Sequence, residues 1–176
     1  ELGRDLLSRV IFGGRISLAT GAIAVAIAGS VGALAGLAAG YVEGFPGALI
    51  MRFMDFMLAV PGILLAITIA AVLGRGFWPA TIAVTVISVP AFARLARASV
   101  LSTKEEEFVQ STRSAGAGHT YLMFRTIFPN ALSPLIVQAS VAAATAVLLE
   151  AALSFLGLGT QPPSPSWGMS LALGKS

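Results

Sequence analysis

The sequence contains no cysteine, one histidine and few charged residues. The lack of cysteine excludes a disulfide framework and a thiolate-zinc site, and the lone His119 cannot build a metal cluster. Charged residues make up 11% of the chain, against roughly 25% in soluble domains. Because a water-facing surface needs more charge than this, the composition excludes a disordered chain and almost any monomeric globular enzyme.

Apolar residues are abundant: 56% of the chain is hydrophobic and the mean hydropathy is +0.88. The net charge of +3 and the pI near 10.0 would suit a nucleic-acid-binding protein. However, the basic residues stand singly between apolar runs and form no stripe with interleaved aromatic residues. We therefore expect a lipid bilayer as the surroundings of this chain, and no nucleic acid as a partner.

Four runs without charge are long enough to cross a bilayer, since an ionised side chain at its centre costs roughly 2.5–3.5 kcal/mol. The sequence thus predicts an all-α, polytopic membrane helix bundle in a single domain. The basic residues at the ends of the spans and beyond them divide five against six, so the positive-inside rule leaves the orientation open. The predicted spans are about 16–42, 54–74, 77–96 and 130–155, with a loop over 99–129 and a tail over 156–176.

Small residues and prolines mark how these spans pack. Gly32, Gly36 and Gly40 recur at every fourth position, which predicts a helix face that a neighbouring backbone approaches closely. Pro61 and Pro90 fall within the second and third spans, where each removes a backbone hydrogen bond and predicts a kink. Structural packing explains the glycines, and for the prolines it explains the pattern as well as a kink that serves gating does.

The long polar stretch between the third and fourth spans runs from Lys104 to Arg125. It predicts two short helices, over 104–115 and 121–128, the second ending at Pro129. The turn between them falls at Gly116, where glycine permits a positive φ without a Cβ clash. The simplest interpretation of this stretch is a helical hairpin that lies at the membrane surface.

The hairpin resembles the cytoplasmic loop of the permease subunits of bacterial ATP-binding-cassette importers. In that family a Glu-Ala-Ala group is followed by three residues, a glycine, nine residues and Ile-x-Leu-Pro. Here Gly116 is followed by twelve residues and then Pro129, which is the family spacing, and 126–128 occupy the Ile-x-Leu places.

The Glu-Ala-Ala positions depart from the family pattern. They hold Gln110, Ser111 and Thr112, which keep polar or small side chains but lose the acid. Glu107 lies three residues before Gln110, on nearly the same helix face, and is placed to substitute for that acid.

Further blocks, in the family's order, resemble the C-type permeases of the dipeptide, oligopeptide and nickel importers. The family's plan has six helices, of which this chain would lack the first and the last. The blocks are Glu1–Asp5, Leu7–Arg9, Gly14–Leu18, Pro129–Leu132, Glu150–Ala151, Leu153–Gly159, Gln161–Pro163 and Pro165–Gly168.

The resemblance implies a type I importer transmembrane domain in the bacterial inner membrane, with loop 94–125 cytoplasmic and the tail extracytoplasmic. The implied partners are a second permease subunit, two ATPase subunits and an extracytoplasmic solute-binding protein. The cargo would be a short peptide or, as the second choice, nickel or a related small solute. No catalytic residue, metal site or cofactor is expected, because ATP hydrolysis belongs to the partners. The residues expected to dock the ATPase are Glu107, Gln110, Ser111, Thr112, Arg113, Ala115, Gly116, Ala117 and Pro129.

Two other classes of function stay open at this point. An ion- or proton-driven secondary carrier would use the ionisable residues Asp55 and Glu150. However, Arg52 precedes Asp55 by three residues, which predicts an ion pair at the interface, and Glu150 is expected at a boundary or an inter-subunit contact. A membrane scaffold that does not transport would use the hairpin only to recruit a soluble partner.

Overall fold

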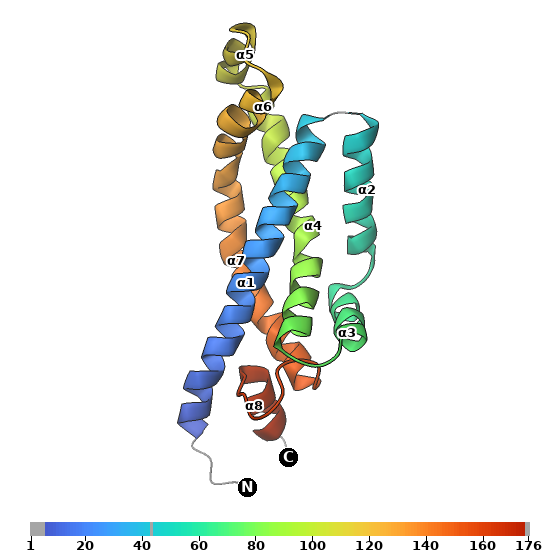
Figure 1. The fold of residues 1–176 in the computed structure, drawn as a ribbon, viewed down its shortest axis with the longest axis vertical. Coiled ribbons are helices and arrows are strands. Elements are labelled where there is room, and N and C mark those ends of the chain that lie inside the picture. Colours follow the sequence, from blue (N-terminus) through green and yellow to red (C-terminus); the bar gives the residue numbers. More distant parts are fainter. Residues whose placement is uncertain (1–5, 43, 175–176) are drawn as a thin grey trace. The chain divides into compact units, whose positions relative to one another are not determined.

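In a computed structural model, the chain is described over residues 6–42 and 44–174. The block Glu1–Asp5 of the resemblance lies outside the described residues. All regular structure in the described part is helical (Figure 1), which confirms the all-α prediction. The elements are α1 (Leu6–Tyr41), α2 (Phe45–Ala59), α3 (Gly62–Leu73), α4 (Phe77–Lys104), α5 (Glu107–Ser114), α6 (His119–Tyr121), the π-helix η1 (Leu122–Ile127), α7 (Phe128–Phe155) and α8 (Trp167–Gly174).

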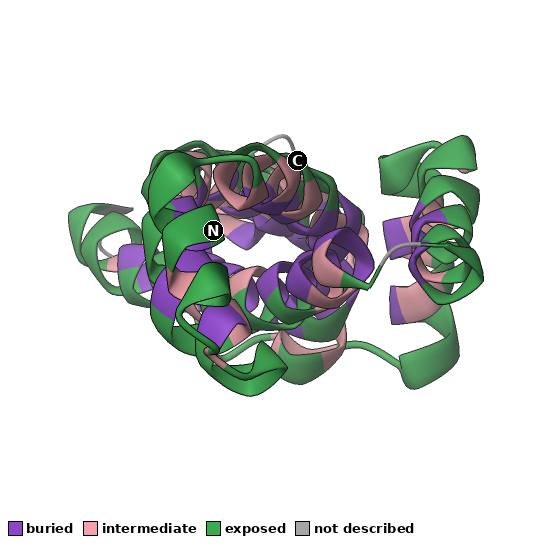
Figure 2. Ribbon diagram, turned by 90° about the horizontal axis from the view of Figure 1, so that it is seen from above, coloured by how far each residue is buried: buried purple, intermediate pink, exposed green. Residues whose placement is uncertain are grey.

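Three helical stretches in the described residues are long and apolar enough to cross a membrane, and a fourth is obtained if α2 and α3 count as one interrupted span. Buried residues gather on one side of many of the helices, and exposed residues on the other (Figure 2). Many of the other sides carry large apolar residues, such as Val137 at 66% and Leu148 at 71% exposure. Lipid suits these faces, and the chain is part of a multi-pass membrane protein. The three stretches are Leu7–Tyr41, Phe77–Lys104 and His119–Phe155.

Pro61 separates two helices instead of kinking one. The predicted span 54–74 corresponds to the end of α2 and the whole of α3. Pro61 has extended backbone angles (φ −52°, ψ 123°), and its carbonyl accepts hydrogen bonds from the amides of Leu64 and Leu65. It therefore stands at the start of α3, where its missing N–H leaves no gap in the helical hydrogen bonds. α4, in contrast, continues through Pro90.

Pro129 does not end a helix. The expected second short helix continues without interruption through η1 into α7. An α-helix would leave a carbonyl without a donor four residues before a proline. Here the preceding turn is π-helical, and the amide of Phe128 bonds to the carbonyl of Met123 five residues earlier. The wider turn accommodates the proline ring, so the helix runs on.

The chain divides into two compact units. One unit contains 28–59 and 89–140, and the other contains 1–27, 60–88 and 141–176. We call them the hairpin unit and the glutamate unit.

In the hairpin unit, the glycine face of α1 packs on α4 as predicted. A Cβ atom added to Gly32 would lie 2.6 Å from Cβ of Phe92, and one added to Gly40 would lie 2.9 Å from Cγ1 of Val100. A Cβ atom on Gly36 would overlap the carbonyl of Ala93. The two helices therefore approach each other as closely as small residues allow.

The glutamate unit is held together by a buried polar cluster. Glu150 is 1% exposed, and its carboxylate accepts hydrogen bonds of 2.6 Å from the hydroxyls of Ser17 and Ser154. The indole Nε1 of Trp167 donates to the carbonyl of Val10 at 2.9 Å. Glu150 was expected at a boundary or an inter-subunit contact, and both of its hydrogen-bond partners lie within this chain.

Candidate functional site

The polar hairpin begins directly after α4. The amides of Glu105 and Glu106 bond back to the carbonyls of the last turn, and Glu106 is extended. α5 then starts at Glu107 and ends at Ser114. Glu107 in its first turn and Arg113 in its last turn both oppose the helix dipole, which stabilises this eight-residue helix.

Gly116 forms the corner of the hairpin and has φ +87°, which confirms the positive φ predicted for it. Its amide bonds to the carbonyl of Arg113 at 3.0 Å, and the amide of Ala117 bonds to that of Thr112 at 3.3 Å. This pair of bonds is the Schellman motif, which ends a helix with glycine in the left-handed region. A Cβ atom on Gly116 would meet nothing within 4 Å, so only its backbone conformation requires glycine.

Two apolar side chains of the hairpin pack against the helices of the hairpin unit, and we call this contact the seat of the hairpin. Val109 of α5 is 3% exposed and Leu122 of η1 is 4% exposed. They belong to one buried cluster with Leu37 of α1 and Val100 of α4. Burial of each such side chain contributes roughly 1.5–3 kcal/mol, so α5 is fixed to α1 and α4.

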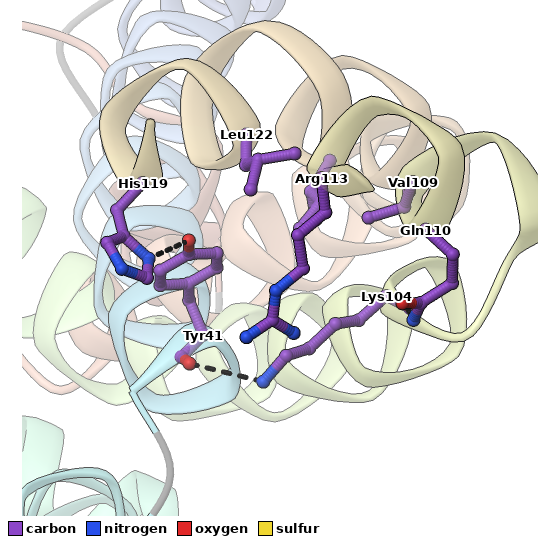
Figure 3. A pocket seen from close by; sticks show the side chains of 8 residues that line it. Tyr41, Lys104, Val109, Gln110, Arg113, His119 and Leu122 are labelled. Carbon is purple, nitrogen blue, oxygen red and sulfur yellow. Dashed lines mark hydrogen bonds between the residues drawn. The ribbon is translucent and has the colours of Figure 1, made fainter. Parts of the chain in front are cut away.

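A small pocket of about 110 Å³ lies beside this seat (Figure 3). Within it, the hydroxyl of Tyr41 is hydrogen-bonded to Nδ1 of His119 at 2.7 Å. Nζ of Lys104 donates to the carbonyl of Tyr41 at 3.3 Å and lies 5.6 Å from the centre of its ring. The lining is Tyr41, Lys104, Val109, Gln110, Arg113, His119, Leu122 and Ile127.

The pocket is positively charged. The side chains of Lys104 and Arg113 extend towards Tyr41 from α4 and α5 (Figure 3), and no acidic residue is in the lining. Such a pocket attracts acidic groups, since both cations bind carboxylates well. Among the described residues, no group of three His, Cys, Asp or Glu side chains could hold a metal ion.

The predicted docking residues fall in two places. Those from Glu107 to Ala117 lie on α5 or at its carboxyl end, and they are exposed except for the half-exposed Thr112 and Ala117. The hydroxyl of Thr112 donates to the carbonyl of Phe108 at 2.7 Å, so α5 itself uses that donor. Pro129 lies apart from them, in the first turn of α7.

Gln110 and Arg113 are brought together at the pocket, while Ser111, Ala115 and Gly116 are exposed outside its lining. Gln110 also closes the end of α4, because its Nε2 donates to the carbonyl of Lys104 at 3.1 Å.

Of the eight residues that line the pocket, only Gln110 and Arg113 were predicted as site residues; the polar residues that sequence reasoning missed are Tyr41, Lys104 and His119. Tyr41 and His119 are 78 positions apart, so no spacing rule joins them. The position of His119 directly after the glycine corner was the one local signal.

Comparisons of the sequence with known proteins identify a family. The sequence profile of the binding-protein-dependent transport system inner membrane component matches residues 32–175. The di/tripeptide transport system permease protein DppC of Pseudomonas aeruginosa is 51% identical over 98% of the chain. The glutathione transport system permease protein GsiD of Pectobacterium atrosepticum is 44% identical over 97% of it. The dipeptide transport system permease protein DppC of Alkalihalophilus pseudofirmus is 45% identical over 98% of it.

The chain spans 57% of the length of each of these three relatives. The profile match covers the hairpin, its seat and most of the apolar helices. The chain therefore belongs to the family of inner membrane components of binding-protein-dependent transport systems.

Proposed function

We propose that the chain is part of a permease subunit of an ATP-driven importer of short peptides in the bacterial inner membrane. The observation that carries the proposal is the hairpin: an exposed short helix, closed by Gly116 and fixed to the membrane helices through Val109 and Leu122. A partner ATPase that binds α5 would therefore move the helices on which α5 is seated.

The connections of α5 suit the transmission of force. Two residues, Glu105 and Glu106, separate it from α4, and the helix that follows the corner continues into α7. A displacement of α5 thus reaches two long apolar helices without a flexible linker in between. Closure of an ATPase dimer would rock these helices between inward and outward access.

The exposed surface of α5 supplies the contacts with the ATPase. Glu107, Gln110 and Arg113 offer polar groups, and the small Ala115 and Ala117 flank the corner and allow close approach. The positive pocket at Arg113 favours an acidic residue on the ATPase.

The printed names of the relatives concern di/tripeptides, dipeptides and glutathione, which favours a peptide cargo over nickel. By the same resemblance, the subunit would pair with a second permease and receive its cargo from a solute-binding protein outside the membrane. The loop 94–125 would then face the cytoplasm.

Cross-linking tests the docking directly. The chain has no cysteine, so Arg113→Cys places a single reactive thiol of this chain on α5. In inverted vesicles with the full-length subunit and its partners, a bifunctional thiol reagent should link it to an ATPase subunit. Val137→Cys, an exposed position of α7, is the matched control and should not be linked. Labelling of Arg113→Cys only from outside sealed cells would refute the proposal.

A further inference from the structure

A second cavity of the hairpin unit holds three charged side chains. It is lined by α2 and α4 and has a volume of about 340 Å³, which is within the size range of small-molecule sites. Asp55 contributes a carboxylate, and Arg94 and Arg97 contribute guanidinium groups. The rest of the lining is apolar: Met51, Ala98 and Leu101.

Asp55 and Arg94 form an accessible ion pair. Nη2 of Arg94 lies 2.6 Å from Oδ1 of Asp55, and the two side chains are 53% and 51% exposed. Arg94 thus takes the place of the expected partner Arg52, because α4 brings its guanidinium to the cavity. A half-exposed ion pair contributes little to stability, so a ligand can exchange for either partner at small cost.

Arg97 adds a second cation to the same wall. It follows Arg94 by three positions, which places both on one face of α4. Its Nε atom is buried and has no hydrogen-bond partner among the described residues. With two arginines and one aspartate the cavity has an excess of one positive charge. Arg94 and Arg97 lie towards the cytoplasmic end of the apolar helix α4 in the proposed orientation, and charged residues on membrane helices commonly face cavities on the path of a substrate.

We propose that this cavity binds the two ends of a short peptide during transport, an inference that depends on the proposed function. Arg97 and Arg94 bind the α-carboxylate, and Asp55 binds the α-ammonium group. Every unmodified linear peptide carries these two groups whatever its side chains, so the site fits the peptide class and not one sequence. The excess positive charge disfavours a bare divalent cation such as nickel.

Equilibrium binding to the full-length importer in nanodiscs tests the site, without the solute-binding protein, which would select peptides first. The probes are dialanine, dialanine amide, which lacks the carboxylate, and N-acetyl-dialanine, which lacks the ammonium group. Arg97→Gln should weaken dialanine binding roughly tenfold, the effect of one lost charge-assisted hydrogen bond, and leave dialanine amide unchanged. Asp55→Asn should remove the preference for dialanine over its N-acetyl form.

Arg52→Gln is the matched control, because Arg52 is on α2 but lines a different cavity; it should bind dialanine as the unmodified protein does. The double variant Asp55→Arg with Arg94→Asp retains an ion pair. It moves one arginine from α4 to α2, away from Arg97, so the variant should still lose dialanine binding. Normal binding in the double variant would mean that the pair is only structural and would overturn the site.

Three other results would overturn the site. The unmodified protein could fail to bind dialanine, or it could bind all three probes equally. Finally, the Arg97→Gln protein could retain less anionic lipid but bind dialanine normally, which would identify a lipid phosphate as the occupant of the cavity. If ATP still drives dialanine uptake in any of these cases, only this site is wrong. If ATP drives no peptide uptake, the proposed function fails as well.

Discussion

The glutamate unit buries a charged side chain, whereas the hairpin unit exposes its charged side chains at cavities. In the glutamate unit, Glu150 is buried and both of its carboxylate oxygens accept a serine hydroxyl. In the hairpin unit, Asp55 is half exposed and Arg113 is exposed, and each lines a cavity. The difference indicates that the buried cluster connects helices of one chain, while the exposed charges remain open to solvent and, in our proposals, bind a peptide and an ATPase.

The largest effect is expected from the buried carboxylate. Glu150→Ala leaves the hydroxyls of Ser17 and Ser154 without their acceptor and opens a cavity, so the free energy of unfolding should fall by about 3 kcal/mol. Thermal unfolding of the full-length protein in detergent measures this. Asp55→Ala, which removes an exposed carboxylate, is the control and should cost less than about 1 kcal/mol. If both substitutions lowered the free energy of unfolding equally, the proposed difference between the two units would be wrong.

A smaller, local effect is expected at the seat of the hairpin. Val109→Ala removes buried apolar surface and should destabilise the attachment of α5 by about 2 kcal/mol. Hydrogen exchange should then become faster in α5 and stay unchanged in the half of α7 that contains Glu150. Phe108→Ala, at a neighbouring side chain that is 44% exposed, should have little effect. Unchanged exchange in the Val109 variant would show that α5 is held in another way.

The smallest effect is expected at the pocket. Tyr41→Phe removes the hydroxyl bonded to His119 but keeps the ring beside Lys104, so stability should fall by about 0.5–1 kcal/mol. The same thermal unfolding assay resolves this loss when it is compared with Tyr121→Phe, whose side chain is 56% exposed. A loss as large as that in Glu150→Ala would mean that the pocket is structural and not a contact surface.

Local backbone chemistry made much of the fold predictable. Charge-free runs indicated the apolar helices, the repeat of Gly32, Gly36 and Gly40 indicated the close helix contact, and Gly116 indicated the corner. These features depend on residues that are neighbours in the sequence or one helical turn apart.

The remaining features depend on how distant helices register against each other. Ser17 and Glu150 are 133 positions apart, and the partner of Asp55 is on another helix, so spacing could not indicate either contact. The predictions at Pro61 and Pro129 were wrong because they also depend on more than the local sequence. The sequence shows that a hydrogen bond is missing, but not whether the chain breaks, as before α3, or widens into a π-turn, as before Pro129.

Substitution of Gly116 tests most directly whether the hairpin couples ATP hydrolysis to transport. In the full-length importer reconstituted with its ATPases and solute-binding protein, substrate-stimulated ATP hydrolysis should be lost in Gly116→Val, because a β-branched residue resists the positive φ. It should be retained in Gly116→Asn, since asparagine tolerates that conformation. Normal stimulation in a well-folded Gly116→Val protein would contradict the account.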